Sequence, residues 1–249
     1  MHIIVCISHV PDTTTKIRFN ENLTDLDTQG IKWVVNPWDD LTLTRAIELK
    51  EQSNGKISKV TVLHAGDSST EPVLRKALAM GADEAWRIDG NFSDSYTIAC
   101  QLARAIKDKD YNLVVCGIES SDYNGSAVGG MLSELLGIPA VSSVSSIDID
   151  DNNFTVVRET ETGKEKLKVN GPFLIVGQKG VASDPRIPSM RGIMMARSKP
   201  INVIPADECK SFTQTLKFEY PKPKAPCRFF DPEDTDELVR ILRDEAGVL

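Results

Sequence analysis

The segment 112-NLVVCGIESSDYNGSAVGGMLSELLG-137 decides the fold of this chain. It opens with an apolar run typical of a buried strand and closes with MLSELLG, which is typical of an amphipathic helix that ends on a glycine. About a dozen small and polar residues lie between them, whereas a strand-to-helix loop usually has about two to six. The segment therefore predicts a strand and a helix joined by an enlarged, glycine-rich loop.

The same alternation of strands and helices extends toward the N-terminus. Apolar runs predict strands at 2–8, 58–65 and 85–88, and helical periodicity predicts helices at 39–53 and 93–110. Another helix should start after Ser68 or Ser69 as its N-cap and end at Gly81. This order predicts an α/β fold with a doubly wound, mainly parallel, Rossmann-like sheet.

The pattern changes after Pro139. Runs at 140–150, 154–161, 164–170 and 172–178 predict further strands, which extend the same sheet or its edge. From about Pro205 the chain is rich in proline, and its end predicts one helix capped by Asp231 with Pro232 in its first turn. Such a segment forms no core alone. We therefore expect an α/β domain at 1–204 and a C-terminal arm at 205–249 that packs on this domain or on another chain.

The charge and hydropathy of the chain exclude two classes of function. The 249 residues carry a net charge of −7, which argues against nucleic-acid binding through a basic surface. No apolar run approaches the roughly 20 residues needed to span a membrane. The first apolar run begins at the N-terminus without a basic leader, so we expect a first strand rather than a signal peptide. The odd number and wide spacing of the cysteines lead us to expect a reducing, cytoplasmic compartment.

The cysteines and histidines indicate no metal site and no catalytic site. Five cysteines, at 6, 100, 116, 209 and 227, are odd in number and widely spaced, which argues against disulfides and zinc. Cys6 and Cys116 lie in apolar strands, where thiols are usually buried and inert. The three histidines lack metal-ligand spacing. No Ser/His/Asp or Cys/His arrangement is recognisable, so we assign no catalytic residue and no metal ligand.

The enlarged loop has the composition of a phosphate site. Glycine-rich backbone offers several N–H groups to one anion, and a helix N-terminus adds positive potential. GSAVGG matches neither the dinucleotide fingerprint nor the P-loop, and the glycines alternatively supply only turn conformations. Asp122 reaches a ribose hydroxyl or caps the loop. Trp38 is either a core anchor or an exposed ring at a cofactor or partner surface.

Several segments together resemble the β subunit of electron transfer flavoproteins. These are VCISHVPDTTTKIRF, NPWDD…RAIELKE, LRKALAMGADEAWRI, LVVCGIESSDYNGSAVGGMLSELLGIP, RETETGKEKLKVNGP and RIPSMRGIMMARSKPI, in the family's order over roughly 1–204. The resemblance implies an adenine nucleotide alpha hydrolase-like fold that holds AMP structurally. It also implies an α subunit that carries the redox-active FAD. Electrons would arrive from acyl-CoA or related dehydrogenases, as in fatty acid oxidation, and leave to a quinone oxidoreductase. The chain would be an electron carrier subunit rather than an enzyme.

The resemblance also implies the residues of the nucleotide site. They are Cys6, Asn36, Pro37, Trp38, Asp39, Ala65, Gly117, Ser121, Asp122, Asn124, Gly125, Ser126, Ala127 and Val128. The chain departs from the family where many members have GKQ, since it has GIE at 117–119. It also has Ser126 and Ala127 where Gln or Asn is common. Backbone N–H groups must therefore supply most of the contacts to the phosphate.

The segment RIPSMRGIMMARSKPI resembles the family's recognition loop for dehydrogenases. Met190 occupies the position of its apolar anchor, with Arg191, Gly192 and Ile193 beside it. A methionine there suits an adaptable contact. The alternative is that these apolar residues belong to the core.

Two other functions remain open. SMRG at 189–192 resembles relatives that bind a second FAD in place of AMP and bifurcate electrons from NADH. The alternative of another class is a stand-alone ATP- or AMP-binding module like universal stress proteins, which are shorter and lack the arm.

Overall fold

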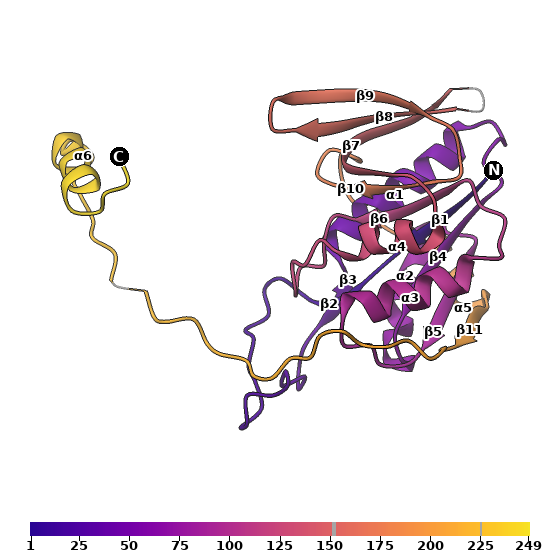
Figure 1. Cartoon of the computed structure of the whole chain (residues 1–249), viewed down its shortest axis with the longest axis horizontal. Coiled ribbons are helices and arrows are strands. Elements are labelled where there is room, and N and C mark those ends of the chain that lie inside the picture. Colours follow the sequence, from indigo (N-terminus) through magenta and orange to yellow (C-terminus); the bar gives the residue numbers. More distant parts are fainter. Residues whose placement is uncertain (151–152, 225) are drawn as a thin grey trace.

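A large mixed sheet forms the centre of the protein (Figure 1). The computed structural model describes residues 1–150, 153–224 and 226–249. Within these ranges the sheet has the order β11-β5-β4-β1-β6-β10-β7-β8-β9. Its strands are β1 (His2–Cys6), β4 (Lys59–Ala65), β5 (Glu84–Asp89), β6 (Leu113–Gly117), β7 (Ala140–Asp150), β8 (Asn153–Thr160), β9 (Gly163–Val169), β10 (Phe173–Gly177) and β11 (Ile201–Pro205).

The sheet is parallel from β11 to β7, and β8 and β9 add an antiparallel edge. The chain winds from β1 through β4 to β5 on one side and then returns to β6 on the other side of β1. The switch point therefore lies between β1 and β6, where open α/β sheets bind ligands beyond the carboxyl ends of their strands.

Helices cover both faces of the sheet, which confirms the doubly wound fold. One core lies under α1 (Pro37–Gln52), α2 (Glu71–Met80) and α5 (Met190–Ser198), and the other under α3 (Ser95–Ile106) and α4 (Val128–Leu136). The alternation of side chains along a strand produces this division. In β1, Ile3 and Val5 enter the first core, whereas Ile4 and Cys6 enter the second.

Two helices begin differently from the sequence prediction. Ser68 or Ser69 was predicted as the N-cap of α2. In the structure both lie in a 3-10 turn, η1 (Ser68–Thr70), that precedes α2, and Asp67 caps this turn by accepting the Ser69 N–H at 2.8 Å. The last helix, α6 (Thr235–Asp244), begins beyond a turn in which Asp231 accepts the Glu233 N–H at 3.1 Å. In both places an aspartate bonds to the backbone two residues later and forms a turn in place of the first helical residues.

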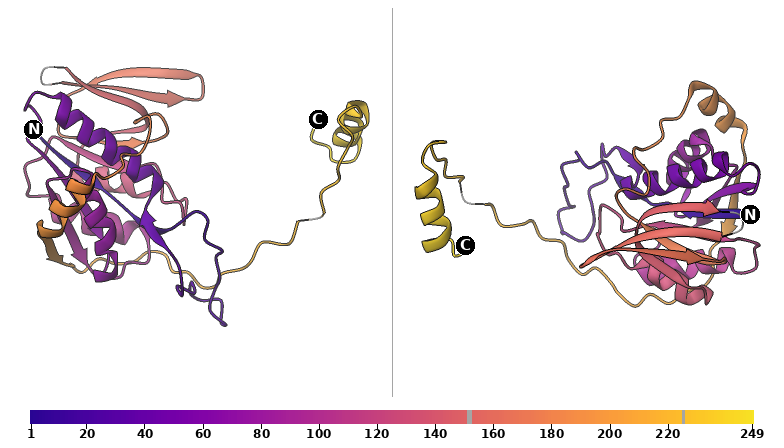
Figure 2. Two further views of the ribbon diagram at one scale, coloured as in Figure 1. Left: turned by 180° about the vertical axis from the view of Figure 1, so that it is seen from behind. Right: turned by 90° about the horizontal axis from the view of Figure 1, so that it is seen from above.

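Residues 206–224 run along the body and then away from it, and no residue of the terminal helix α6 is buried (Figures 1 and 2). The middle of this segment contacts the loop between β2 (His9–Pro11) and β3 (Trp33–Val35), a small antiparallel pair. There the ring of Phe218 stacks on Phe19 at 4.7 Å, and the Tyr220 hydroxyl accepts the Phe19 N–H at 3.1 Å. These contacts determine where the arm leaves the body.

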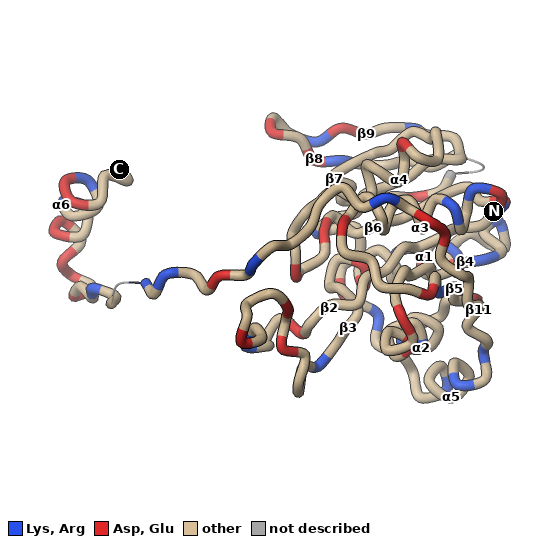
Figure 3. Tube along the Cα trace, turned by 60° about the horizontal axis from the view of Figure 1, so that its bottom comes forward, with Lys and Arg blue, Asp and Glu red and all other residues tan. Residues whose placement is uncertain are grey.

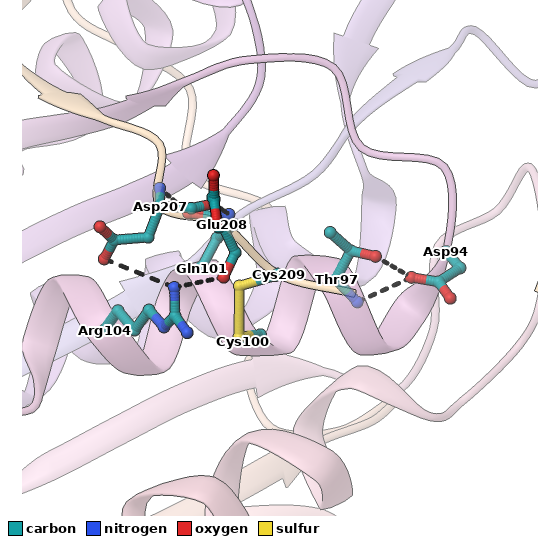
Figure 4. The surroundings of a disulfide bond; sticks show 8 residues. All are labelled: Asp94, Thr97, Cys100, Gln101, Arg104, Asp207, Glu208 and Cys209. Atoms are coloured by element: carbon teal, nitrogen blue, oxygen red, sulfur yellow. Dashed lines mark hydrogen bonds and ion pairs between the residues drawn. A yellow bond between two sulfur atoms is a disulfide. The ribbon is translucent and has the colours of Figure 1, made fainter. Parts of the chain in front are cut away.

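A disulfide joins Cys100 of α3 to Cys209 of the arm (Figure 4). The prediction of no disulfide is therefore wrong for this pair. The two residues are 109 positions apart in sequence, and they meet only because the chain passes back over α3 after β11. Cys6 and Cys116 are buried free thiols, as predicted, and Cys227 is free and exposed.

Candidate functional site

Asp39 lies at the switch point and joins the ends of two central strands. Its carboxylate accepts the Ser8 N–H at 2.7 Å, just beyond β1, and the Gly117 N–H at 3.1 Å, at the end of β6. The side chain is buried, and burial raises its pKa to about 7 against the lowering effect of hydrogen bonds from Asn36, Ser8 and Gly117. A charge-bearing group thus forms the floor of the site.

Asn36, directly before α1, holds the start of the enlarged loop. Its side-chain amide donates to the Glu119 carbonyl at 2.8 Å and accepts the Ser121 N–H at 3.1 Å. The residue is fully buried. Sequence reasoning placed Asn36 in the site, but its two contacts with residues more than 80 positions away are a product of the fold.

The loop presents backbone N–H groups at the N-terminus of α4. Asn124 and Ser126 have positive φ angles of 49° and 47°, whereas Gly125 does not, so the unusual turn conformations fall on non-glycine residues. Ser126 is followed by Ala127 in the right-handed helical region, and such a change of hand between neighbours makes successive N–H groups converge on an anion-binding concavity. The first helical bond runs from Met131 to the Ala127 carbonyl, so the amides of Val128 to Gly130 have no partner within the helix.

The side chains of the loop do not supply a cation. Residues 117–139 contain no Lys, Arg or His. Asp122 accepts the Tyr123 N–H at 2.9 Å, and Ser126 donates to Glu119 at 3.0 Å. An anion at this helix N-terminus would therefore be held by backbone N–H groups rather than by charged side chains.

An open pocket of about 450 Å³ lies next to this loop. It is lined by Trp38, Ile118, Glu119, Glu159, Gln178, Lys179 and Gly180. Trp38 is half-buried and lines the pocket, so it is not an anchor deep in the core. Gly117 has no room for a side chain because a Cβ atom there would meet Asp39 and Trp38. Sequence reasoning did not identify Glu159 and Lys179. Glu159 lies in β8 and Lys179 follows β10, and these segments approach Trp38 of α1 only in the tertiary structure.

The other predicted residues lie around the same strand ends. Cys6 ends β1 beside Cys116 of β6, and both belong to the core beneath the loop. Ala65 ends β4 and is half-buried, while Pro37 is exposed in the first turn of α1. The fold thus brings together residues from four separate parts of the sequence at the carboxyl edge of the sheet.

The predicted partner-binding residues open a helix rather than a loop. Ser189 accepts the Gly192 N–H at 3.0 Å and caps α5, and the Met190 and Met194 side chains are 75% and 69% exposed. This exposure contradicts the alternative that Met190 belongs to the core. Residues 186–199 contain four basic residues and no acidic one, and the charged residues within α5 are arginines (Figure 3).

Buried His64 has a structural environment. Its Nδ1 bonds to the Ile7 carbonyl at 2.8 Å, and burial lowers its pKa to about 4. Among the described residues, no cluster of three or more His, Cys, Asp or Glu side chains could hold a metal ion. No helix in the same ranges is both long and apolar enough to cross a membrane.

Comparisons with known proteins point to one family. The family model described as "Electron transfer flavoprotein domain" matches residues 24–209. The chain is 32% identical to the electron transfer flavoprotein subunit beta of Bacillus subtilis over 266 aligned residues, which cover 100% of both chains. It is 36% identical to the same subunit of Thermoanaerobacterium thermosaccharolyticum, over 84% of this chain and 80% of the relative. It is 33% identical to the caffeyl-CoA reductase-Etf complex subunit CarD of Acetobacterium woodii, over 82% of this chain and 78% of the relative.

Proposed function

This chain belongs to the electron transfer flavoprotein family as a β-type subunit, and we propose that it holds AMP as a structural cofactor. The observation that carries the proposal is the concavity of N–H groups from Ser126 to Gly130 at the start of α4. It suits a phosphate, and the pocket beside Trp38 adds an aromatic wall. The residues of the site therefore fit a mononucleotide whose phosphate is bound by backbone donors.

The bound nucleotide would act on structure rather than chemistry. Asn36 and Asp39 fix the loop and the strand ends through buried hydrogen bonds. AMP bound at this point would bridge the loop and the α1 N-terminus and so order the switch point. The chain would then be an electron carrier subunit, with FAD held mainly by an α subunit.

The α subunit would be held by the C-terminal arm, residues 205–249. Leu238, Ile241 and Leu242 recur at helical spacing on α6, which has no buried residue in this chain. An amphipathic helix with an uncovered apolar side is suited to pack on another protein. We propose that the heterodimer acts in the cytoplasm.

A dehydrogenase would deliver electrons after docking on α5. The exposed methionines provide an adaptable apolar contact, and Arg191, Arg197 and Lys199 provide a basic rim. The partner would therefore present an apolar pocket with acidic residues around it. Acyl-CoA dehydrogenases or related enzymes are the proposed donors, and a quinone oxidoreductase is the proposed acceptor.

A second candidate function is electron bifurcation with a second FAD in place of AMP and NADH as the donor. Two observations favour it: the SMRG sequence that opens α5, and the relative from a caffeyl-CoA reductase-Etf complex. The second FAD would occupy the same phosphate concavity, with its larger ring system toward the pocket by Trp38.

Nucleotide analysis of the co-purified heterodimer tests both candidates. The protein is denatured, and the released nucleotides are separated and quantified. We expect one FAD and one AMP per heterodimer. Two FAD and no AMP would replace the first candidate by the second. A stable homodimer that binds ATP without any flavoprotein partner would instead favour a stand-alone nucleotide-binding module.

A further inference from the structure

The base of the C-terminal arm lies along α3, antiparallel to the helix (Figure 4). Asp207 and Glu208 contact Gln101 and Arg104 near the helix C-terminus, while Phe212 lies at the N-terminal end. Cys100, Gln101 and Arg104 are neighbours on one side of α3, because residues three or four apart share a helix face. The arm therefore follows a defined track on the helix.

The N-terminal end of this track is held firmly. One carboxylate oxygen of Asp94 accepts the Phe212 and Thr213 N–H groups at 2.7 and 3.1 Å, and the other accepts the Thr97 N–H at 2.7 Å. Asp94 is buried, and hydrogen bonds to a charged group are the stronger kind. We call these hydrogen bonds the Asp94 clamp, and we expect them to persist whether the disulfide is oxidised or reduced.

Apart from its covalent bond, the other end of the track is held by hydrogen bonds to backbone groups of the arm. Gln101 exchanges two hydrogen bonds with the Asp207 backbone, at 2.6 and 3.1 Å, and Arg104 donates to the Glu208 carbonyl at 2.7 Å. The Arg104 and Asp207 side chains are 44% and 62% exposed, so water competes for the contacts of Arg104, whereas Gln101 is buried. The Cys100–Cys209 bond is the strongest attachment between β11 and the Asp94 clamp.

We propose that the Cys100–Cys209 disulfide is a redox-controlled latch, which fixes arm residues 206–211 on α3 and is opened by a dithiol reductant. Cys209 is partly exposed whereas Cys100 is buried, so an attacking thiolate reaches the Cys209 sulfur first. The mixed disulfide forms on Cys209, and Cys100 leaves as a thiolate that takes up a proton. The second thiol of the reductant then attacks the reductant sulfur that is bonded to Cys209, and Cys209 is released as a thiol. The reductant thus becomes a cyclic disulfide after giving up two electrons and two protons.

Opening the latch loosens the base of the arm while the Asp94 clamp and the Phe19–Phe218 stack keep the next part in place. The redox state then controls how rigidly the arm is connected to the body. A further consequence, which rests on the proposed function, is that the oxidised chain holds its partner subunit longer than the reduced chain does.

Amide hydrogen exchange on the purified chain tests the latch. Cys227→Ser serves as the parent, because it removes the exposed free thiol. We expect the Asp207 amide, which donates to Gln101, to exchange roughly tenfold faster after treatment with a dithiol, as for a locally opened segment. The Phe212 and Thr213 amides, bound by Asp94, are internal controls that should change little. A Cys209→Ser derivative should behave as reduced under both conditions.

Two results would overturn the latch. One is a parent protein that gains no thiols on treatment with dithiol after prior oxidation. The other is an Asp207 exchange rate that is the same in both redox states. If either occurs in a chain that still pairs with its flavoprotein partner, the latch is wrong and the proposed function stands. If the Asp207 exchange rate depends on the redox state in a chain that pairs with no flavoprotein subunit, the latch stands and the proposed function is wrong.

Discussion

Two neighbouring glycines of α4 should respond oppositely to alanine. A Cβ atom on Gly129 would lie 2.7 Å from Val176 Cγ2 of β10, whereas a Cβ atom on Gly130 would meet nothing within 4 Å. Valine is branched at Cβ and cannot easily turn away, so Gly129→Ala must push α4 off the sheet. Such overpacking costs about 1–3 kcal/mol.

The two variants share a gain that cancels in their comparison. Alanine improves helix propensity by up to about 1 kcal/mol over glycine. Gly130→Ala should therefore be stabilised by that amount, and Gly129→Ala should lie about 1–3 kcal/mol below it. For a chain of this size, about 2–4 °C in Tm corresponds to each kcal/mol, so we expect a separation of roughly 2–12 °C.

Urea and thermal unfolding of the two variants at the same pH and protein concentration measure this difference. The midpoints should separate while the urea m value stays constant, because both proteins expose similar surface on unfolding. Equal midpoints for the two variants would refute the close approach of α4 to β10.

Three further predictions concern the floor of the site, α5 and the arm. Burial raises the pKa of Asp39 from 3.8 to about 7 in the folded state, so the native state binds this proton more tightly than the unfolded state does. The free energy of unfolding should therefore fall as the pH rises from about 4 to about 7. This pH dependence should vanish in Asp39→Asn, and an unchanged profile would disprove the assignment. Met190→Ala should slow reduction by a partner dehydrogenase about tenfold without loss of Tm, as for an interface anchor; unchanged reduction kinetics would refute the docking role. Truncation after Pro205 should abolish co-purification with the α subunit, and normal co-purification would show that the arm is dispensable for pairing.

Local patterns predicted most of the fold because they depend on short-range physics. The apolar runs at 2–8, 58–65 and 112–117 all became central strands, since a strand buried on both faces is apolar throughout. The starts of α2 and α6 were predicted less well. There the side chains of Asp67 and Asp231 form turns, and competition between a turn and a helical start depends on the exact backbone path.

The presence of the enlarged loop was also predicted from the sequence. Its length, its glycines and the helix after it indicated an anion site, and the structure adds that Asn124 and Ser126 carry the positive φ angles. The pocket wall formed by Glu159 and Lys179 was not predictable, because neither residue has a local signal that relates it to Trp38.

The amino-acid sequence by itself determined the order of strands and helices, the enlarged loop and the family, because hydrophobic periodicity and motif spacing are properties of neighbouring residues. Only the tertiary structure decided which distant groups meet. It brought Asp39 to the ends of β1 and β6, and it brought Cys209 to Cys100 across 109 positions, against the prediction from cysteine spacing. The physical reason is that such contacts arise when the completed sheet brings α1 to its carboxyl edge and returns the chain over α3, and no short stretch of sequence encodes that approach.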